Sequence, residues 1–376
     1  MKKKLIINAT NVGKKISGIG RGTLSLLKEI DKLLGLNKIP EYEIIVYANK
    51  KMYSVFSQFN NLKIKYVTDL LSPDIGFRGH FLRLIWTNFL GLKEKNSIIF
   101  NTSQLEGQII PLSKRKNVII TLIYDLIPYI YKFPKQVYYY KYFLPFVINN
   151  SYKIITVSNY SKNLIQYIYK CDAKKIIVIP LGVSENFYLT NQERKNWILY
   201  VGRFHKIKNI NGIIKAFSIL INRYKLDYKL ILVGPNNLDL NQYNFLDKNL
   251  KSRISIYINI NDIKLRELYN TASLFIFPSF YEGFGLPPLE AMACGCPVVV
   301  SNTTSLPEVC GDAAYYVNPY NIENIAEGMY KVLTDFSLRK TLIKKGLERV
   351  KQFSWEKAIK KFLKIVEKIT NEFNND

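Results

Sequence analysis

The feature that most constrains this chain is the alternation of short apolar runs with longer segments of helical periodicity. Such alternation predicts parallel sheets that are covered by helices on both faces. Two series of runs predict two domains, which suits a chain of 376 residues. The runs are residues 4–10, 42–48, 97–100, 117–124, 153–157 and 175–180 in the first series, and 197–202, 229–234, 254–258, 273–277 and 297–301 in the second.

The boundary between the two domains is predicted from the segment 183–196, which is polar and has neither helical nor strand periodicity. That composition is typical of a linker. We therefore expect an N-terminal domain over residues 1–184 and a C-terminal domain over 185–354. Beyond these, apolar residues at helical spacing and alternating charges predict an amphipathic helix at about 355–376, which we expect to pack back on the N-terminal domain.

The chain is strongly basic, with 54 Lys and Arg against 29 Asp and Glu and a formal charge of +25. This excess favours an anionic partner: nucleic acid, a phosphorylated substrate or an acidic membrane surface. Nucleic acid is not expected, because no RNP, helix-turn-helix or zinc pattern occurs. No run of 18 apolar residues occurs, and the start MKKKLIINAT leads into a strand pattern instead of a signal peptide. We expect a cytoplasmic protein that is peripheral at the inner face of the cytoplasmic membrane.

The cysteines and histidines predict neither disulfides nor a metal site. Cys294 and Cys296 are too close for a CxxC pair, and neither His80 nor His205 has a second ligand at metal spacing. With two histidines in the whole chain, a Ser-His-Asp triad is not expected either. We therefore expect reduced thiols and no structural metal.

The segment 280–295, FYEGFGLPPLEAMACG, follows the apolar run 273–277 directly. Gly283 and Gly285 allow backbone angles that are closed to other residues. The two prolines at 287–288 suit the first turn of a helix, and the glycine that closes the segment suits its end. The order predicted is strand, glycine loop and short helix.

This loop has the chemistry of a ligand site, because it offers unpaired N–H groups and the positive end of a helix dipole. Glu282 in the loop and Glu290 in the first helical turn are expected to face the crevice beyond the strand end. Carboxylates accept hydrogen bonds from hydroxyls, so the pair suits a sugar and a ribose. In the alternative interpretation, Glu290 only complements the helix N-terminus and the glycines only form a turn.

Two further loops follow predicted strands. In NVGKKISGIGRGT, Gly18, Gly20 and Gly22 precede a helical pattern; the match to GxGxxG is poor, and a ligand loop and a plain turn both remain open. Arg203 and Lys208 lie five residues apart just after the run 197–202. Two cations at the end of a strand suit a diphosphate, although two neighbouring basic residues are unremarkable in so basic a chain.

Six motifs occur in the order SGIGRGT, ITLIYDLIP (121–128), ITVSNYSK (155–162), VIPLGVS (178–184), YVGRFHKIKN (200–209) and EGFGLPPLE (282–290). Together they resemble the family 4 retaining glycosyltransferases, and most of all their mannosyltransferase members, over nearly the whole chain. The resemblance implies the GT-B fold: two Rossmann-like, doubly wound parallel-sheet domains that face a central cleft. The N-terminal domain would bind the acceptor and the C-terminal domain the nucleotide sugar.

The resemblance also implies roles for individual residues. Arg203 and Lys208 would hold the donor diphosphate, Glu282 and the following backbone the transferred sugar, and Glu290 the ribose. One departure is that Tyr124 precedes Asp125 where many relatives carry His, so an imidazole role is absent there. The residues implied to be catalytic are Glu282, Arg203, Lys208 and Asp125, and those implied to bind the donor are Gly18, Gly20, Gly283, Phe284, Gly285, Leu286 and Glu290.

The expected reaction is transfer of mannose from GDP-mannose to a growing glycan that is lipid-linked or part of an envelope polysaccharide. A UDP-hexose or dTDP-deoxyhexose donor remains an alternative. No metal or other cofactor is expected, since the nucleotide sugar is itself the substrate. Other classes are a GT-B epimerase, a phosphorylase, which would need a pyridoxal lysine that we do not find, a nucleic-acid-binding basic protein and an inert scaffold.

Two segments of the N-terminal domain mix basic and aromatic residues, which predicts docking on an anionic membrane surface. The alternative is a helix that packs its apolar stripe on the sheet and leaves its charges solvated. The segment 138–143 reads YYYKYF. The segment 77–95 combines Arg78, Arg83, Lys93 and Lys95 with Phe81, Leu84, Ile85, Trp86 and Phe89.

Overall fold

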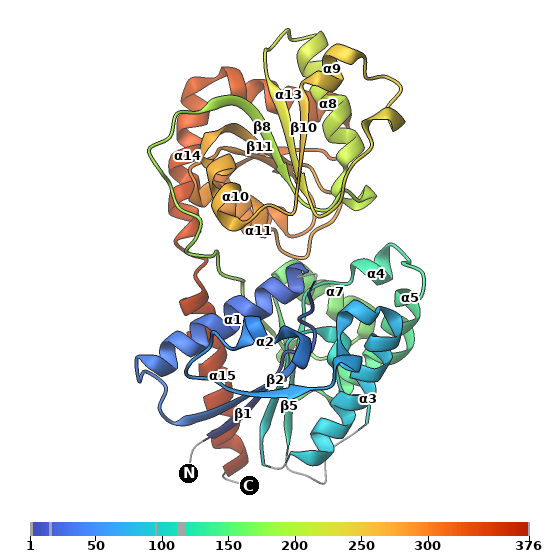
Figure 1. Ribbon diagram of the computed structural model, residues 1–376, viewed down its shortest axis with the longest axis vertical. Coiled ribbons are helices and arrows are strands. Elements are labelled where there is room, and N and C mark those ends of the chain that lie inside the picture. The colour runs from blue at the N-terminus through green and yellow to red at the C-terminus, as the bar shows by residue number, and fades with distance from the viewer. Residues whose placement is uncertain (1–2, 15–16, 95, 111–116, 375–376) are drawn as a thin grey trace. The chain divides into compact units, whose positions relative to one another are not determined.

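The protein forms two compact units in the computed structural model, which describes residues 3–14, 17–94, 96–110 and 117–374 (Figure 1). Unit 1 comprises Met1–Gly182 and Trp355–Asp376, and unit 2 comprises Val183–Ser354. The chain thus passes into unit 2 at the start of the polar segment 183–196 and returns to unit 1 for its last helix. None of the described helices is long and apolar enough to cross a membrane.

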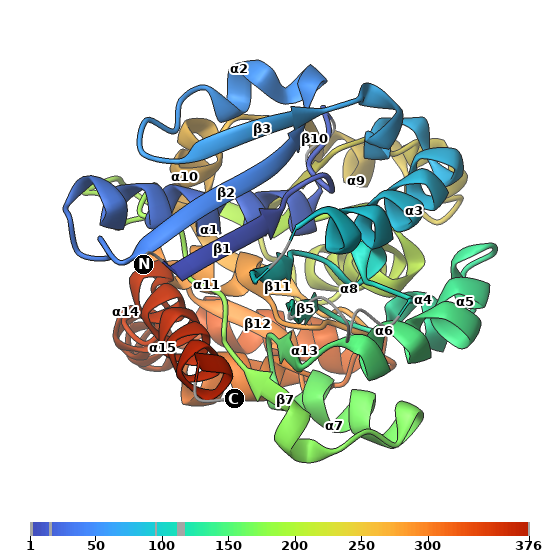
Figure 2. The same ribbon diagram turned by 90° about the horizontal axis from the view of Figure 1, so that it is seen from below.

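Unit 1 is built on a sheet of seven parallel strands in the order β3-β2-β1-β4-β5-β6-β7 (Figure 2). In the centre of the sheet, Leu5 lies opposite Ile44 on one side and Ile98 on the other. The strands are β1 (Lys3–Asn8), β2 (Tyr42–Asn49), β3 (Lys63–Val67), β4 (Ile98–Asn101), β5 (Val118–Ile123), β6 (Lys153–Thr156) and β7 (Ile176–Val178).

Helices cover both faces of this sheet because consecutive strand residues point to opposite faces. Phe100 of β4 contacts Phe362 of α15, with ring centroids 4.5 Å apart, whereas the preceding Ile99 packs with Leu90 of α3. Figure 2 accordingly shows α15 and α3 on opposite sides of the strands. The helices are α1 (Gly18–Gly35), α2 (Tyr53–Phe56), α3 (Phe77–Lys93), α4 (Ile127–Ile130), α5 (Gln136–Tyr138), the π-helix η6 (Tyr139–Phe143), α6 (Leu144–Asn150), α7 (Asn159–Tyr169) and α15 (Trp355–Asn374).

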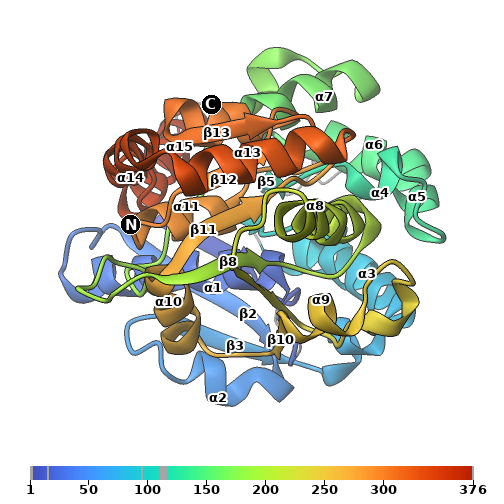
Figure 3. The same ribbon diagram turned by 90° about the horizontal axis from the view of Figure 1, so that it is seen from above.

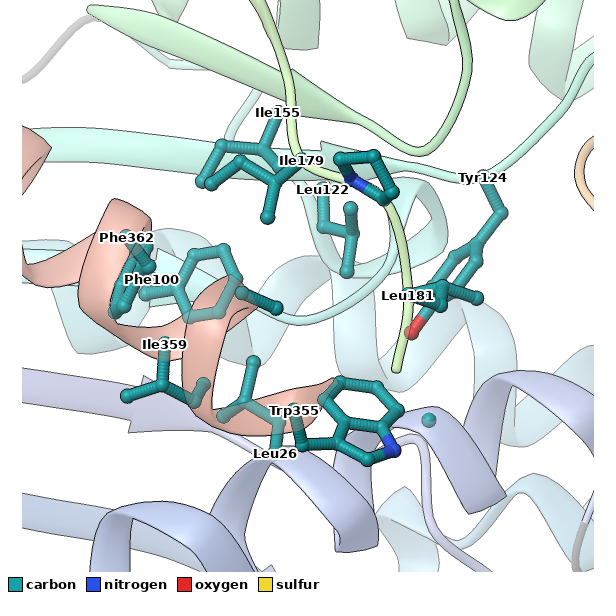
Figure 4. Close-up of a pocket in the computed structure, with 13 residues that line it drawn as sticks. Leu26, Phe100, Leu122, Tyr124, Ile155, Ile179, Leu181, Trp355, Ile359 and Phe362 are labelled. Carbon is teal, nitrogen blue, oxygen red and sulfur yellow. The ribbon is translucent and has the colours of Figure 1, made fainter. Parts of the chain in front are cut away.

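Helix α15 is held in unit 1 by its apolar face. Figure 4 shows Trp355, Ile359 and Phe362 of α15 directed at Leu26 of α1 and at side chains of the central strands. The space between them is a cavity of about 30 Å³. That volume holds about two water molecules, so the cavity is a packing void and not a ligand site.

Unit 2 is built on six parallel strands in the order β10-β9-β8-β11-β12-β13 (Figure 3). Helices α8 and α13 contact each other, while α10 contacts β8 and β11, and α11 packs on α14. The strands are β8 (Lys195–Val201), β9 (Lys229–Gly234), β10 (Ile254–Ile258), β11 (Ala272–Phe277), β12 (Val298–Ser301) and β13 (Ala314–Val317). The helices are α8 (Ile210–Asn222), α9 (Lys248–Ser252), α10 (Asp262–Thr271), α11 (Leu286–Ala293), α12 (Leu306–Cys310), α13 (Ile322–Thr334) and α14 (Phe336–Val350).

The predicted fold class is confirmed, since all eleven apolar runs form strands of two parallel sheets. Two strands were not predicted, β3 and β13, and both lie at a sheet edge. β3 reads KIKYV and so lacks the continuous apolar run of a central strand. The strand order reverses between β1 and β4 in unit 1 and between β8 and β11 in unit 2. Open α/β sheets bind ligands at the carboxyl ends of such strand pairs.

Candidate functional site

The carboxyl ends of β8 and β11 in unit 2 carry the two loops singled out by the sequence. After β8 comes the loop of Arg203 with the 3₁₀ turn η8 (Lys206–Lys208), and after β11 comes the glycine loop that leads into α11. The N–H of Phe280 donates to the carbonyl of Ile207 at 2.8 Å. This bond holds the two loops together, so their side chains act as one site.

Lys208 and Glu282 form the centre of this site. The Nζ atom of Lys208 donates to both carboxylate oxygens of Glu282, at 2.6 and 2.7 Å. Only 10% of the Glu282 side chain and 22% of the Lys208 side chain are exposed. Removing either partner would leave a poorly solvated charge, so the two residues are expected to depend on each other.

Three further residues hold these loops, and the sequence did not identify them. Asn209 has a left-handed backbone (φ 58°), and its Nδ2 atom donates to the carbonyls of Pro278 at 3.1 Å and Pro319 at 2.8 Å. The Thr304 hydroxyl accepts from the N–H of Glu282 at 3.1 Å. The Ser305 hydroxyl lies 2.9 Å from the carbonyl oxygen of Glu282. The hydroxyl run that follows β12, next to β11 in the sheet, is the signal that would have found Thr304 and Ser305.

The predicted order of strand, glycine loop and short helix is confirmed. Gly285 has φ +125°, and a Cβ atom there would lie 2.7 Å from Cδ2 of Leu306, so only glycine fits. The prolines lie at the start of α11, where no N–H is needed. The helix ends at Gly295, which has a left-handed backbone. The N–H of Gly295 donates to the carbonyl of Met292, and the N–H of Cys296 donates to the carbonyl of Ala291. This is a Schellman motif.

The predicted position of Glu290 in the first helical turn is wrong. α11 begins at Leu286, so Glu290 is its fifth residue and lies in the second turn. Its Oε2 atom accepts a hydrogen bond from the Tyr269 hydroxyl at 3.0 Å. Burial, together with the charge of Glu290, raises the pKa of Tyr269 well above its usual value, so the phenol stays a donor. Tyr269, on α10, thus orients Glu290, and no motif indicated it.

Arg203 is exposed, and no ion pair is formed by its guanidinium within the part of the chain that the structure describes. The Tyr200 hydroxyl fixes the backbone of this residue by donating to its carbonyl at 3.0 Å. The structure therefore places Arg203 and Lys208 in one loop, with Lys208 paired to Glu282 and Arg203 directed to solvent.

Gly18, Gly20 and Asp125 belong to unit 1. The prediction that the glycines precede the helix is wrong, because α1 begins at Gly18. The Ser17 hydroxyl caps the helix by accepting from the N–H of Gly20 at 3.2 Å, which draws the glycines into its first turn. Asp125 follows β5, and its Oδ1 atom accepts from the N–H of Ile127 at 2.9 Å, which forms an Asx turn.

Tyr124, the departure from the family pattern, is buried, and burial raises the pKa of its hydroxyl. A Cβ atom on Gly22 would lie 2.7 Å from the Tyr124 oxygen, so the phenol occupies space that this glycine leaves free. Tyr124 therefore stays protonated and does not replace an imidazole as a proton acceptor.

Unit 1 carries a second polar site, at the carboxyl ends of β1 and β4. Asn8 Nδ2 lies 3.2 Å from both Asn101 Oδ1 and Thr87 Oγ1, and the Thr102 hydroxyl donates to the carbonyl of Asn8 at 2.7 Å. All four side chains are fully buried. The sequence analysis missed this cluster, although the polar residues that follow two neighbouring parallel strands were a usable signal.

No group of three or more His, Cys, Asp or Glu side chains suited to a metal ion occurs in the described ranges. Cys171, Cys294, Cys296 and Cys310 are free thiols. Charged groups at the carboxyl edge of unit 2 include Arg203, Lys208, Glu282 and Glu290.

Residues 185–349 match the profile of the family Glycosyl transferases group 1. The matched residues lie within unit 2. O-antigen chain mannosyltransferase B of Escherichia coli is 35% identical over 217 residues, and this match spans 54% of the chain but only 57% of that relative's length. O-antigen chain mannosyltransferase RfbU of Salmonella typhimurium is 27% identical over 84% of this chain and 87% of its own length.

The chain also resembles solved structures over nearly its whole length. Sucrose-phosphate synthase from Thermosynechococcus elongatus superimposes with a TM-score of 0.76 at 18% identity, covering 99% of this chain and 100% of that chain. At such low identity the likeness shows the fold alone. With the two parallel sheets, it confirms the GT-B fold that the motifs predict.

Proposed function

We propose that this chain is a retaining mannosyltransferase of the family Glycosyl transferases group 1, which moves mannose from GDP-mannose to a growing glycan that is lipid-linked or part of an envelope polysaccharide. The observation that carries the proposal is the Lys208–Glu282 pair, which joins the loop after β8 to the glycine loop after β11. The names of the O-antigen mannosyltransferase relatives support the sugar and the kind of acceptor.

The first half of the chemistry is stabilisation of the leaving nucleoside diphosphate. Arg203 offers a planar fork of donors, and Lys208 offers a point charge in the same loop. The start of α11 adds the positive end of a helix dipole. Because the two loops are hydrogen-bonded together, these groups are in place before charge develops on the departing phosphate, where fixed groups act most strongly.

The second half is recognition of the sugar. In the proposal, Glu282 accepts hydrogen bonds from the hexose hydroxyls, with the backbone of Gly283, Phe284, Gly285 and Leu286 around the ring, and Glu290 accepts from the ribose. Both oxygens of Glu282 already bind Lys208, which suits an orienting acceptor and not a nucleophile. The leaving phosphate then takes the proton of the acceptor hydroxyl on the same face of the sugar, which retains the anomeric configuration.

Unit 1 is proposed to bind the acceptor. Asp125 and the start of α1 at Gly18 and Gly20 offer polar groups for its hydroxyls, and the buried amides of Asn8 and Asn101 hold the neighbouring ends of β1 and β4. Because a lipid-linked acceptor is met at the inner face of the cytoplasmic membrane, we propose a cytoplasmic protein that is peripheral there. Nucleic acid is not a proposed partner.

The test is released nucleotide from a panel of GDP-mannose, UDP-hexoses and a dTDP-deoxyhexose, with an O-antigen-type acceptor, followed by NMR of the new anomeric proton. GDP-mannose is expected to turn over fastest and to give a product of unchanged anomeric configuration. Preference for a UDP or dTDP sugar would overturn the donor assignment alone. Failure of every nucleotide sugar to bind or turn over would overturn the proposal.

A further inference from the structure

Helix α3 of unit 1 buries three polar side chains. Arg83, Thr87 and Asn88 are buried, with 3%, 0% and 7% of their surface exposed. Arg83 donates to Glu106 at 3.0 Å and to the carbonyl of Leu71 at 2.9 Å. Asn88 accepts from the N–H groups of Ile109 and Ile110 at 3.0 and 2.9 Å. The buried face of α3 is therefore held by hydrogen bonds and one ion pair, besides the apolar contacts of Leu84 and Leu90.

The opposite side of α3 is apolar and exposed. Phe81, Ile85 and Phe89, at a spacing of four residues, expose 52%, 53% and 58% of their surface, and Leu82 and Leu92 extend the same stripe. The alternative that α3 packs its apolar stripe on the sheet therefore holds for Leu84 and Leu90 but not for Phe81, Ile85 and Phe89. Single exposed apolar residues are ordinary, but a stripe along the full length of a helix indicates a surface that something covers.

A groove of about 320 Å³ runs beside the stripe and shares Phe89 with it. Tyr47, Tyr66 and Trp86 form its aromatic lining, and Lys65 and Lys93 supply two ammonium groups. The buried carboxylate of Glu94 offsets only part of this charge. It binds Lys4 Nζ and the Tyr47 hydroxyl at 2.6 Å each and lies 4.0 Å from Lys65 Nζ, so the three lysines and this one glutamate leave a formal charge of +2. The groove therefore suits an anionic group that is attached to an apolar molecule.

The segment next to α3 repeats this chemistry. η6 contacts α3 through the rings of Tyr139 and His80, whose centroids are 4.9 Å apart. On η6 and its flanks, Tyr138, Tyr142 and Phe146 expose more than half of their surface, and Lys141 lies 5.2 Å from the Tyr142 ring centroid. The apolar and cationic surface thus extends beyond a single helix.

We infer that the outer face of α3 docks on an anionic lipid bilayer, with the apolar stripe entering the interface and the groove binding a phospholipid headgroup phosphate between Lys65 and Lys93. Charge complementarity selects this occupant. α3 carries no acidic residue, and the chain has a formal charge of +25, so a second copy would bring two cationic surfaces together. The role of this docking in catalysis rests on the proposed function, in which the acceptor is lipid-linked and is met at the membrane.

The residues that touch the bilayer differ from those the sequence suggested. Arg83 and Leu84 are buried, so neither contacts lipid, because Arg83 instead holds α3 to Glu106. Trp86 lines the groove, Arg78 and Lys93 are exposed at the two ends of the stripe, and Lys95 lies outside the described residues. Lys65, on the edge strand β3, joins the surface only through the fold.

The experiment is cosedimentation of the full chain with phosphatidylcholine vesicles that contain increasing phosphatidylglycerol, without nucleotide sugar. Binding is expected to rise with phosphatidylglycerol and to fall with salt. Lys65→Gln with Lys93→Gln should weaken the vesicle partition coefficient by about fivefold for each lysine. Phe81→Ser, Ile85→Ser and Phe89→Ser together should weaken it by at least about tenfold.

Matched controls separate this surface from general charge and hydrophobicity. Lys340→Gln with Lys344→Gln removes the same charge from exposed sites of unit 2, and Ile263→Ser with Phe336→Ser removes side chains that are each 69% exposed there. Both controls should bind vesicles like the unchanged protein. Equal losses in control and α3 variants, binding indifferent to phosphatidylglycerol, or a dimer that the α3 variants dissociate would each overturn the inference. Because no donor is present, such failure leaves the proposed transferase activity untouched.

Discussion

The loops at the carboxyl edge of the unit 2 sheet carry an ion pair, whereas at the same edge of unit 1 a buried cluster of amides and hydroxyls follows the strands. In unit 2, Lys208 and Glu282 form an ion pair on loops that are fixed by hydrogen bonds. In unit 1, Asn8 and Asn101 bind each other and neighbouring hydroxyls. Two sheets of one topology can therefore serve different ligands, because a charged edge suits a diphosphate and a neutral edge suits hydroxyl groups.

The largest effect is expected from removing either residue of the Lys208–Glu282 pair. We expect Lys208→Met or Glu282→Gln to lower kcat about 10²- to 10³-fold, because each removes a fixed group next to the reacting ligand. The double variant should lose less than the product of the two single losses, since each single change leaves a partly buried charge without its partner. Released nucleotide measures the effect, and Lys344→Met, at an exposed site on α14, is the control that should retain full activity.

The shape of the charged edge is tested separately by Gly285→Ala. The left-handed backbone and the approach to Leu306 should lower the free energy of unfolding by about 1–3 kcal/mol. Urea unfolding measures this change. Gly18→Ala is the matched control, because no atom lies within 4 Å of the added methyl group and the residue is helical. It should be neutral or stabilise by up to about 1 kcal/mol; equal losses at both positions would show that the loop is not specially strained.

The neutral edge is tested by Asn8→Ala, which leaves the buried polar atoms of Asn101 and Thr87 with one partner fewer. The free energy of unfolding should fall by about 1–3 kcal/mol. The KM for the acceptor should rise while the KM for the donor stays unchanged, which steady-state kinetics with each substrate varied would measure. Asn222→Ala, at an exposed amide of unit 2, should alter neither quantity. If Asn8→Ala also raised the KM for the donor, the proposed division between a donor edge in unit 2 and an acceptor edge in unit 1 would be contradicted.

The smallest effect is expected from removing metal ions. Arg203, Lys208 and the start of α11 supply positive charge for the leaving diphosphate, so EDTA should change the initial rate of transfer less than about twofold. The measurement is the rate with and without EDTA after dialysis. A loss of activity that Mg²⁺ or Mn²⁺ restores would show that these cations are not sufficient.

The charged edge was largely predictable from sequence because its residues stand in short motifs. Glu282, Gly285 and the prolines lie within nine residues, and their spacing alone predicts a strand, a loop and a helix. Thr304 and Tyr269 were missed because the fold brings them from the turn after β12 and from α10, more than ten residues away. The helix start at Gly18 was missed because a serine cap outweighed the low helix propensity of glycine.

In unit 1 the sequence predicted the central strands but not which side of α3 is buried. Arg83 has a basic side chain that is normally exposed, and only the distant Glu106 explains its burial. The edge strand β3 was missed because its lysines alternate with apolar residues. Such features depend on contacts between segments far apart in the chain, which periodicity does not encode.

The central claim, that the charged edge of unit 2 holds the donor, is tested most directly by hydrogen exchange of the backbone amides with and without saturating GDP-mannose. The account predicts slower exchange in the segments 203–209 and 282–290, with that protection lost in Lys208→Met. Protection confined to the segments 8–23 and 101–106 of unit 1, or no protection anywhere at saturation, would contradict it.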